Sequence, residues 1–370
     1  MAQLWILMGI SLGLAWLHEH AYLRNINNSL SKQKISVVFI LMTILLGGFL
    51  GLRTNYNDTY TYINAYKATK KFPQFWSTFD PSLSADPGFN LCNGIMRSMG
   101  VQTQSWLMIY ALVTIGLYLH FIRKNRNYLV QNIYLFFCVG VYTFAGAAIK
   151  QSIATAICLC GVNYAIEKKW VRYGVIVFIG MTFHVYAAIF FLVPFLMFKP
   201  WTKKTVALII GTIVIAFLLR PFLGAIVDIT SSIGESYTKD SFSGAGVNIF
   251  RVLVCNVPIL LAAVFHKEIF RKMDKKDNLF FNMAMVNGCI MFIGMFGTAN
   301  YFARLANFFV MAQVIILPWM VEKLSGNNRR LIRGAMLIGY FGYFYYSTNV
   351  VYGAFSMKRI KVIEYLQQLF

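Results

Sequence analysis

Apolar stretches dominate the chain, and each is about as long as a lipid bilayer is thick. A helix needs about 20 predominantly apolar residues to cross the hydrocarbon core. Of the 370 residues, 58% are hydrophobic and only 13% are charged, whereas soluble domains carry about 25% charged residues. So few polar side chains cannot cover a water-soluble globule of this size. The composition therefore predicts an all-α, polytopic transmembrane protein and excludes a soluble enzyme, a disordered chain and a fibre.

About ten spans are predicted from the apolar stretches. Short clusters of Lys and Arg separate many of them, and such clusters favour cytoplasmic loops. The net charge of +21 could also indicate nucleic-acid binding, but the spacing of the basic residues follows the loop pattern, so no nucleic acid is expected. With the clusters inside, the N-terminus lies outside. The expected spans are 2–17, 35–52, 104–122, 128–146, 149–166, 205–223, 248–265, 278–296, 301–321 and 332–350.

One further apolar run, 173–198, does not fit a simple crossing. It lies between two basic clusters that both look cytoplasmic, and two full crossings would need about 40 residues. We therefore predict a re-entrant pair of short helices that meet near His184. Irregular backbone at that depth is tolerated only where protein buries it or where it lines a wet cavity.

Two predicted outer loops, 53–103 and 224–247, interrupt an otherwise single integral membrane domain that covers residues 1–370. The first loop carries signals for two amphipathic helices. One helix begins at Asp58, and the other begins with Asp86 as N-cap and Pro87 as first helical residue. Both are expected to lie on the membrane surface.

Five cations from five different spans fall at one predicted membrane level, the outer one. The positive-inside bias and mutual repulsion both oppose such a ring. Carboxylates of the outer loops, or contacts with lipid headgroups, could neutralise these side chains one by one. For the whole set we favour a bound anionic substrate, a lipid-linked phosphate or pyrophosphate. The five residues are Arg53, Lys150, Arg220, Arg251 and Arg304.

His184 is the only one of the five histidines that lies deep inside an apolar run. A lone histidine in such a run is often a core residue. The predicted helix break beside it favours a functional role, because broken helices mark binding sites in membrane proteins, and histidine is a common general base. No cluster of His, Cys, Asp and Glu has metal-ligand spacing, so neither a metal nor another cofactor is expected.

Several short motifs resemble those of the EpsG-type, Wzy-like polysaccharide polymerases over residues 45–320. Each motif alone is weak, and their order and spacing carry the resemblance. The family usually has Arg at the position of Lys150, which keeps the charge but loses paired hydrogen bonding. The motifs are Gly51-Leu52-Arg53 with Asp58-Thr59-Tyr60, Asp86-Pro87-Gly88-Phe89, Lys150-Gln151-Ser152-Ile153-Ala154, Thr182-Phe183-His184, and Arg304 near Tyr301 and Phe302.

The resemblance implies a glycosyltransferase with a GT-C-like fold in the bacterial inner membrane. Such an enzyme joins oligosaccharide repeat units into O-antigen, capsular polysaccharide or exopolysaccharide at the outer face. The donor and the acceptor are both linked to undecaprenyl pyrophosphate, and membrane lipid surrounds them. A flippase and a chain-length regulator are the protein partners that such a polymerase would have.

The resemblance also suggests a role for each motif residue. A sugar hydroxyl attacks the anomeric carbon while lipid pyrophosphate leaves, so the reaction needs a base and a cationic site. His184 is the candidate base, with Asp58 as its competitor or orienting partner. Arg53, Lys150 and Arg304 are the main candidates for pyrophosphate binding. Gln151, Arg251 and Arg220 would complete that site, and Tyr60, Tyr62 and Asp86 would contact sugars.

Two other classes of protein stay open. A transporter or flippase of an anionic lipid-linked substrate would use the same cations and the same broken helix, but it would also need polar residues toward the cytoplasmic half. A membrane O-acyltransferase would use His184 in a catalytic pocket.

Overall fold

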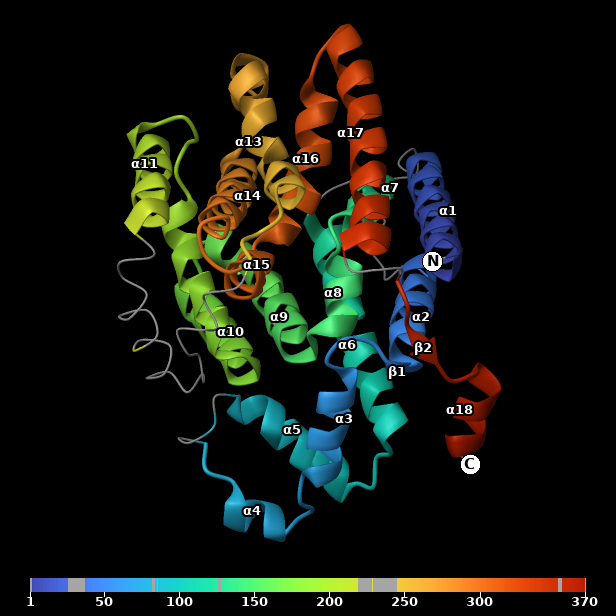
Figure 1. Ribbon diagram of the computed structural model, residues 1–370. Coiled ribbons are helices and arrows are strands. Elements are labelled where there is room, and N and C mark those ends of the chain that lie inside the picture. Colours follow the sequence, from blue (N-terminus) through green and yellow to red (C-terminus); the bar gives the residue numbers. More distant parts are fainter. Residues whose placement is uncertain are drawn as a thin grey trace. The chain divides into compact units, whose positions relative to one another are not determined.

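The computed structural model describes residues 2–25, 37–81, 84, 86–125, 128–218, 228, 245–351 and 355–369. It is 81% helical, which confirms the all-α prediction. The chain divides into two compact units, and Figure 1 labels their helices and strands. Unit 1 contains Met1–Cys160, Ile176–Val185 and Tyr346–Phe370, and unit 2 contains Gly161–Val175 and Tyr186–Tyr345.

Unit 1 contains the N-terminal helices, the first loop and the C-terminal tail. Helix α10 begins in unit 2 and ends in unit 1. The elements are α1 (Ala2–Asn25), α2 (Val37–Gly51), β1 (Arg53–Asn55), α3 (Thr59–Ala68), α4 (Gln74–Thr78), α5 (Pro87–Ser98), α6 (Thr103–Asn125), α7 (Leu129–Cys138), α8 (Val141–Ala147), α9 (Ile149–Ile166), α10 (Trp170–Phe183), η3 (Ser347–Val351), β2 (Lys358–Arg359) and α18 (Val362–Leu369).

Unit 2 contains the helices of the second half of the chain, and α14 and α16 are its most deeply buried elements. The elements are η1 (Val185–Leu196), α11 (Lys203–Leu218), α13 (Ile249–Phe270), α14 (Lys275–Ile293), α15 (Ala299–Asn307), α16 (Val310–Lys323) and α17 (Gly326–Tyr346).

Several helices could cross a membrane. Within the described residues, three helices are long and apolar enough by themselves: Thr103–Asn125, Ile149–Ile166 and Ile249–Phe270. Two bent pairs raise the number to five, because Leu129–Cys138 with Val141–Ala147 and Tyr301–Asn307 with Val310–Lys323 each qualify together, with bends of 51° and 56°. The predicted spans 128–146 and 301–321 correspond to these two bent pairs. A total of about ten spans and a GT-C-like fold stay predictions.

Helices α2 and α6 pack closely because two glycines of α2 face α6. A Cβ added at Gly47 would lie 2.9 Å from the Cα of Leu112, and one added at Gly51 would lie 2.8 Å from the Cα of Met108. The two glycines are four residues apart and therefore share one helix face. This contact fixes the start of α6 beside the end of α2, where the first loop begins.

The C-terminal tail returns to that same end of unit 1. Strand β2 pairs antiparallel with β1, and Arg53 lies opposite Arg359 (Figure 1). The Arg359 guanidinium donates to Gln3 Oε1 at 2.5 Å and lies 3.9 Å from the centre of the Phe49 ring. Gln3, Phe49 and Arg53 are all predicted on the outer side, and the pairing places the tail beside them. The side of the membrane on which they lie stays a prediction.

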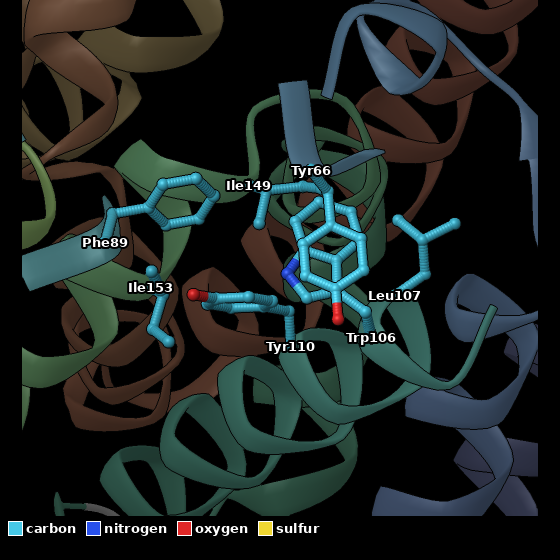
Figure 2. Packing of buried hydrophobic residues seen from close by; sticks show 7 residues of the cluster. All are labelled: Tyr66, Phe89, Trp106, Leu107, Tyr110, Ile149 and Ile153. Atoms are coloured by element: carbon cyan, nitrogen blue, oxygen red, sulfur yellow. The ribbon is translucent and has the colours of Figure 1, made fainter. Parts of the chain in front are cut away.

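An aromatic cluster joins the first loop to two of the apolar helices. Seven buried residues from α3, α5, α6 and α9 form it, and the rings of Tyr66 and Trp106 stack at 4.7 Å (Figure 2). Asn93 accepts hydrogen bonds from Trp106 Nε1 at 2.8 Å and from the Tyr110 hydroxyl at 3.2 Å. The members are Tyr66, Phe89, Trp106, Leu107, Tyr110, Ile149 and Ile153. The first loop is thus a packed element of unit 1.

The helix break predicted near His184 is present. Helix α10 ends at Phe183, and the 3₁₀ helix η1 begins at Val185, so His184 is the residue between them. Whether the two short helices form a re-entrant pair stays a prediction. The predicted outer loop 224–247 lies almost wholly outside the described residues.

Candidate active site

Asp86 joins two of the residues that the sequence singled out. Its Oδ2 accepts a hydrogen bond from Lys150 Nζ at 2.5 Å, and its Oδ1 lies 3.4 Å from His184 Nδ1. The side chain of Asp86 is 6% exposed, that of His184 16% and that of Lys150 34%. All three residues belong to unit 1. The result is a polar cluster of one acid, one base and one ammonium group, which is open at Lys150.

Asp86 is the N-cap residue of α5, as predicted, but its side chain does not satisfy the free N–H groups of the first turn. Helix α5 does begin at Pro87, one residue after Asp86, but the Asp86 side chain makes no hydrogen bond to the first turn. Its two oxygens face Lys150 and His184 instead. A charged partner and an imidazole N–H compete successfully with the backbone N–H groups because hydrogen bonds between charged groups are the stronger ones.

Each of the three residues of the polar cluster has an apolar residue close to it in the sequence that packs in the aromatic cluster or against it. Phe89, three residues after Asp86, and Ile149, one residue before Lys150, belong to the aromatic cluster (Figure 2). Phe183, one residue before His184, packs against that cluster. Lys150 Nζ also lies 5.7 Å from the centre of the Phe89 ring. The core of unit 1 therefore brings the ends of α5, α9 and α10 together.

Gly88 allows α5 to approach α10. A Cβ at this position would collide with the Thr182 side chain, whose hydroxyl donates to the Ile179 carbonyl at 2.7 Å. Thr182 lies two residues before His184 in the chain. Three consecutive residues thus have three functions in the structure. Asp86 supplies the carboxylate, Pro87 begins α5, and Gly88 allows the close contact with Thr182.

The surroundings of Asp86 keep it ionised. Burial alone would raise the pKa of its carboxyl group, but the hydrogen bond from His184 and the charge of Lys150 outweigh burial, so the pKa lies below its ordinary value. An ionised carboxylate can only accept hydrogen bonds. A hydrogen bond between His184 and this carboxylate therefore requires a proton on Nδ1, and in that tautomer the ring lone pair lies on Nε2.

Arg53 has a different setting from the one that the sequence predicted. It is 1% exposed, its Nη1 donates to the Leu50 carbonyl at 2.6 Å, and its Nε donates to Thr59 Oγ1 at 3.2 Å. Burial lowers the pKa of Arg53 to about 10, so the guanidinium stays charged at neutral pH. In this conformation Arg53 holds the turn between α2 and α3, and its predicted role in pyrophosphate binding stays a prediction.

The structure pairs His184 with Asp86, and the role of Asp58 as competitor or orienting partner of His184 stays a prediction. Asp58 is exposed at the start of α3. Tyr60 is 69% exposed, Tyr62 packs against the aromatic cluster, and Gln151 is 3% exposed next to Lys150. Of these four residues, Tyr60 and Asp58 are the ones that a soluble glycan could contact directly.

The remaining cations of the predicted ring lie in unit 2 or outside the described part of the chain. Arg251 Nη2 donates to Asn307 Oδ1 at 3.3 Å, and the Arg304 side chain is exposed on α15. Arg220 lies outside the described residues. The two units are described separately, so a common ring of cations stays a prediction. Among the described residues, no group of three or more His, Cys, Asp or Glu side chains is placed to hold a metal ion.

Sequence reasoning did not specify the two partners of Asp86, and it missed a second group of cations. It assigned Asp86 to sugar contact and also counted it among the outer-loop acids that could neutralise the cations, and its ion pair with Lys150 agrees with the latter interpretation. It also passed over Lys67, Lys71 and Arg97, which line a pocket of about 550 Å³ in unit 1. A signal for them existed, since positive charges in a predicted outer loop depart from the positive-inside pattern.

Comparison with known protein families gives one match. The model of the EpsG family matches residues 36–365, nearly the whole chain. No curated protein and no solved structure matches the sequence. The matched region contains every motif on which the resemblance rested, and it also contains Asp86, Lys150 and His184. The chain belongs to the EpsG family.

Proposed function

We propose that this protein is a glycosyltransferase that polymerises lipid-pyrophosphate-linked oligosaccharide repeat units at the outer face of the bacterial cytoplasmic membrane. Membership of the EpsG family supports a polymerase-like role, and the apolar helices support a membrane location. The observation that carries the proposal is the cluster in which Asp86 contacts both Lys150 and His184.

In this proposal His184 is the general base and Asp86 is its positioning residue. Asp86 holds the proton on Nδ1, so Nε2 can accept the proton of the acceptor hydroxyl as that oxygen bonds to the anomeric carbon. The ionised Asp86 also stabilises the imidazolium that forms. A 3.4 Å separation is long for a hydrogen bond, and contacts of this kind often tighten when substrate binds.

Lys150 is the proposed contact for the leaving group. The bond between the anomeric carbon and the pyrophosphate oxygen breaks, and negative charge develops on the lipid pyrophosphate. An ammonium group has three donor hydrogens, and Asp86 accepts one of them, so two are available for phosphate oxygens. The side chain is 34% exposed, which gives an anion access to it.

A polymerase, a flippase and an O-acyltransferase differ in what they do with the oligosaccharide repeat unit. A flippase moves the lipid-linked unit without making a bond, and an O-acyltransferase decorates the polymer without lengthening it. The deciding experiment deletes the gene in the native host, sizes the surface polysaccharide on a gel and extracts the lipid-linked intermediates.

Loss of long polymer, with single repeat units still displayed, is the result we expect for a polymerase. Repeat units trapped on the cytoplasmic leaflet would contradict the proposal in favour of a flippase. Polymer of normal length that lacks an acyl group would contradict it in favour of an acyltransferase.

A further inference from the structure

A basic pocket lies at the other end of α5 from Asp86. Residues from α3, the segment after it, α5, the start of α6 and α18 line this opening of about 550 Å³, which is in the size range of small-molecule sites. Every lining residue belongs to unit 1. The residues are Ile63, Lys67, Lys71, Arg97, Gly100, Val101, Gln102, Thr103, Gln104 and Gln368.

The charge of the pocket is not balanced by its walls. Lys67, Lys71 and Arg97 contribute three positive charges, and the lining contains no Asp or Glu. Within the described part of the chain, neither Lys67 nor Lys71 forms an ion pair. The first residues of α6, Thr103 and Gln104, also line the pocket, and the N-terminus of a helix favours anions.

A structural role explains the presence of Arg97 at the pocket, but it does not fully explain the presence of the two lysines. The Arg97 guanidinium lies 5.5 Å from the centre of the Tyr66 ring and donates to the Lys67 carbonyl at 3.3 Å and the Thr69 carbonyl at 3.4 Å, so it closes the end of α3. Lys67 follows the usual preference for cations in the last turn of a helix. Lys71 lies beyond that turn, and both lysines are exposed.

The neutral part of the lining matches sugar hydroxyl groups. Gln102, Gln104, Gln368 and Thr103 supply amide and hydroxyl groups that can donate and accept hydrogen bonds. Ile63 and Val101 are the two large apolar side chains of the lining. Gly100 has a φ of +77°, which a glycine adopts without strain, and the turn it forms after α5 leads the chain to these amides.

The pocket and the reacting cluster lie on one helix. Asp86 precedes α5, and Arg97 lies in its last turn. Eleven residues separate them, or about 16 Å along a helix axis. A short oligosaccharide can cover this distance. A sugar in the pocket would therefore be a few units away from the one that reacts.

We propose that this pocket binds an anionic sugar residue of the oligosaccharide, with Arg97 and the two lysines on its carboxylate or phosphate and the amides on its hydroxyls. This inference rests on the proposed function, and it adds that the substrate is an acidic glycan. Arg97 is held by its contacts with α3, so little side-chain entropy is lost when it binds an anion.

The test measures binding to the purified full-length protein in detergent, which does not require polymerase activity. The probe is a tetrasaccharide of galacturonic acid, and a neutral tetrasaccharide of glucose is the reference. We expect the acidic probe to bind at least about tenfold more tightly. The double variant Lys67→Gln/Lys71→Gln should weaken its binding by about five- to tenfold, as expected for two partly solvated charge contacts.

Lys70→Gln is the matched control, because Lys70 is exposed between the two lysines and does not line the pocket. It should bind the acidic probe as the unaltered protein does. Equal binding of the two tetrasaccharides, or equal losses in Lys70→Gln and the double variant, would overturn the inference.

A lipid headgroup is the other source of an anion. The same variants are therefore compared on vesicles of phosphatidylcholine with and without phosphatidylglycerol. Loss of phosphatidylglycerol binding with unchanged tetrasaccharide binding would also overturn the inference. These results do not depend on turnover, so a failure of the polymerase proposal in the deletion strain remains a separate outcome.

Discussion

The two basic sites of unit 1 differ in how their charge is balanced. At the polar cluster, Lys150 forms an ion pair with a carboxylate that is almost fully buried. In the pocket at the other end of α5, the lining supplies three cations and no acid. A balanced, buried pair fixes geometry, whereas an unbalanced, open site attracts an anion. The difference indicates that one end of α5 positions reacting groups and the other end holds charge for a ligand.

The largest expected effect comes from the base. His184→Ala should lower polymer synthesis by about 10²–10⁴-fold, the usual contribution of a general base, while the protein level in the membrane stays near normal. The measurement is polymer length on a gel in the deletion strain that carries the variant gene. His120→Ala in α6 is the control and should make normal polymer. Long polymer from His184→Ala would remove histidine from the chemistry.

The second prediction tests whether Lys150 acts through its charge. Lys150→Met leaves Asp86 without its ion-pair partner, so polymer should be lost. The protein should also lose about 1–3 kcal/mol of unfolding free energy, less than for a fully buried pair because the Lys150 side chain is 34% exposed. Lys150→Arg keeps the charge and should retain long polymer. If both variants polymerise equally, the ion pair is structural only.

The third prediction concerns the close contact that places Asp86 near His184. Gly88→Ala inserts a methyl group where the Thr182 side chain lies, so α5 must move away from α10. We expect about tenfold slower polymerisation, because small displacements of reacting groups are costly. The double variant Gly88→Ala/Thr182→Gly restores space and should recover part of the rate. Normal activity of Gly88→Ala would mean that the contact does not control the cluster.

The smallest effect is a dependence of stability on pH. The pKa of Asp86 in the folded protein lies below its ordinary value, so its contribution is present above about pH 4 and is lost as the pH falls through the folded value. The difference in melting temperature between the unaltered protein and Asp86→Asn should shrink as the pH falls below about pH 4. A difference that persists in strong acid would contradict the assignment of an ionised Asp86.

Some of the site was predictable because its signals are local. Asp86-Pro87 predicts the start of α5, and the basic clusters beside 173–198 predict a break near His184; both features are present. The function of Asp86 was not predictable in this way. Its partners are 64 and 98 residues away along the chain, and no pattern in a single sequence specifies such pairs.

Arg53 is a second residue whose surroundings could not be predicted from the sequence. Its place at the end of an apolar stretch predicts a cation at the membrane surface, and hydropathy cannot tell an open position from a buried one. The turn between α2 and α3 buries Arg53 and supplies its hydrogen-bond acceptors. The partner strand β2 comes from the far end of the chain.

The sequence by itself determined the class of protein, the all-α architecture, the positions of most helices and the family, because composition, periodicity and short motifs are local properties of the chain. Tertiary structure decided which charges meet. The Gly47 and Gly51 contacts with α6, the Gly88 contact with Thr182 and the aromatic cluster bring helix ends together. The interaction energy between two charges decreases as the distance between them grows. The packing of the helices therefore determines which charged side chains form pairs.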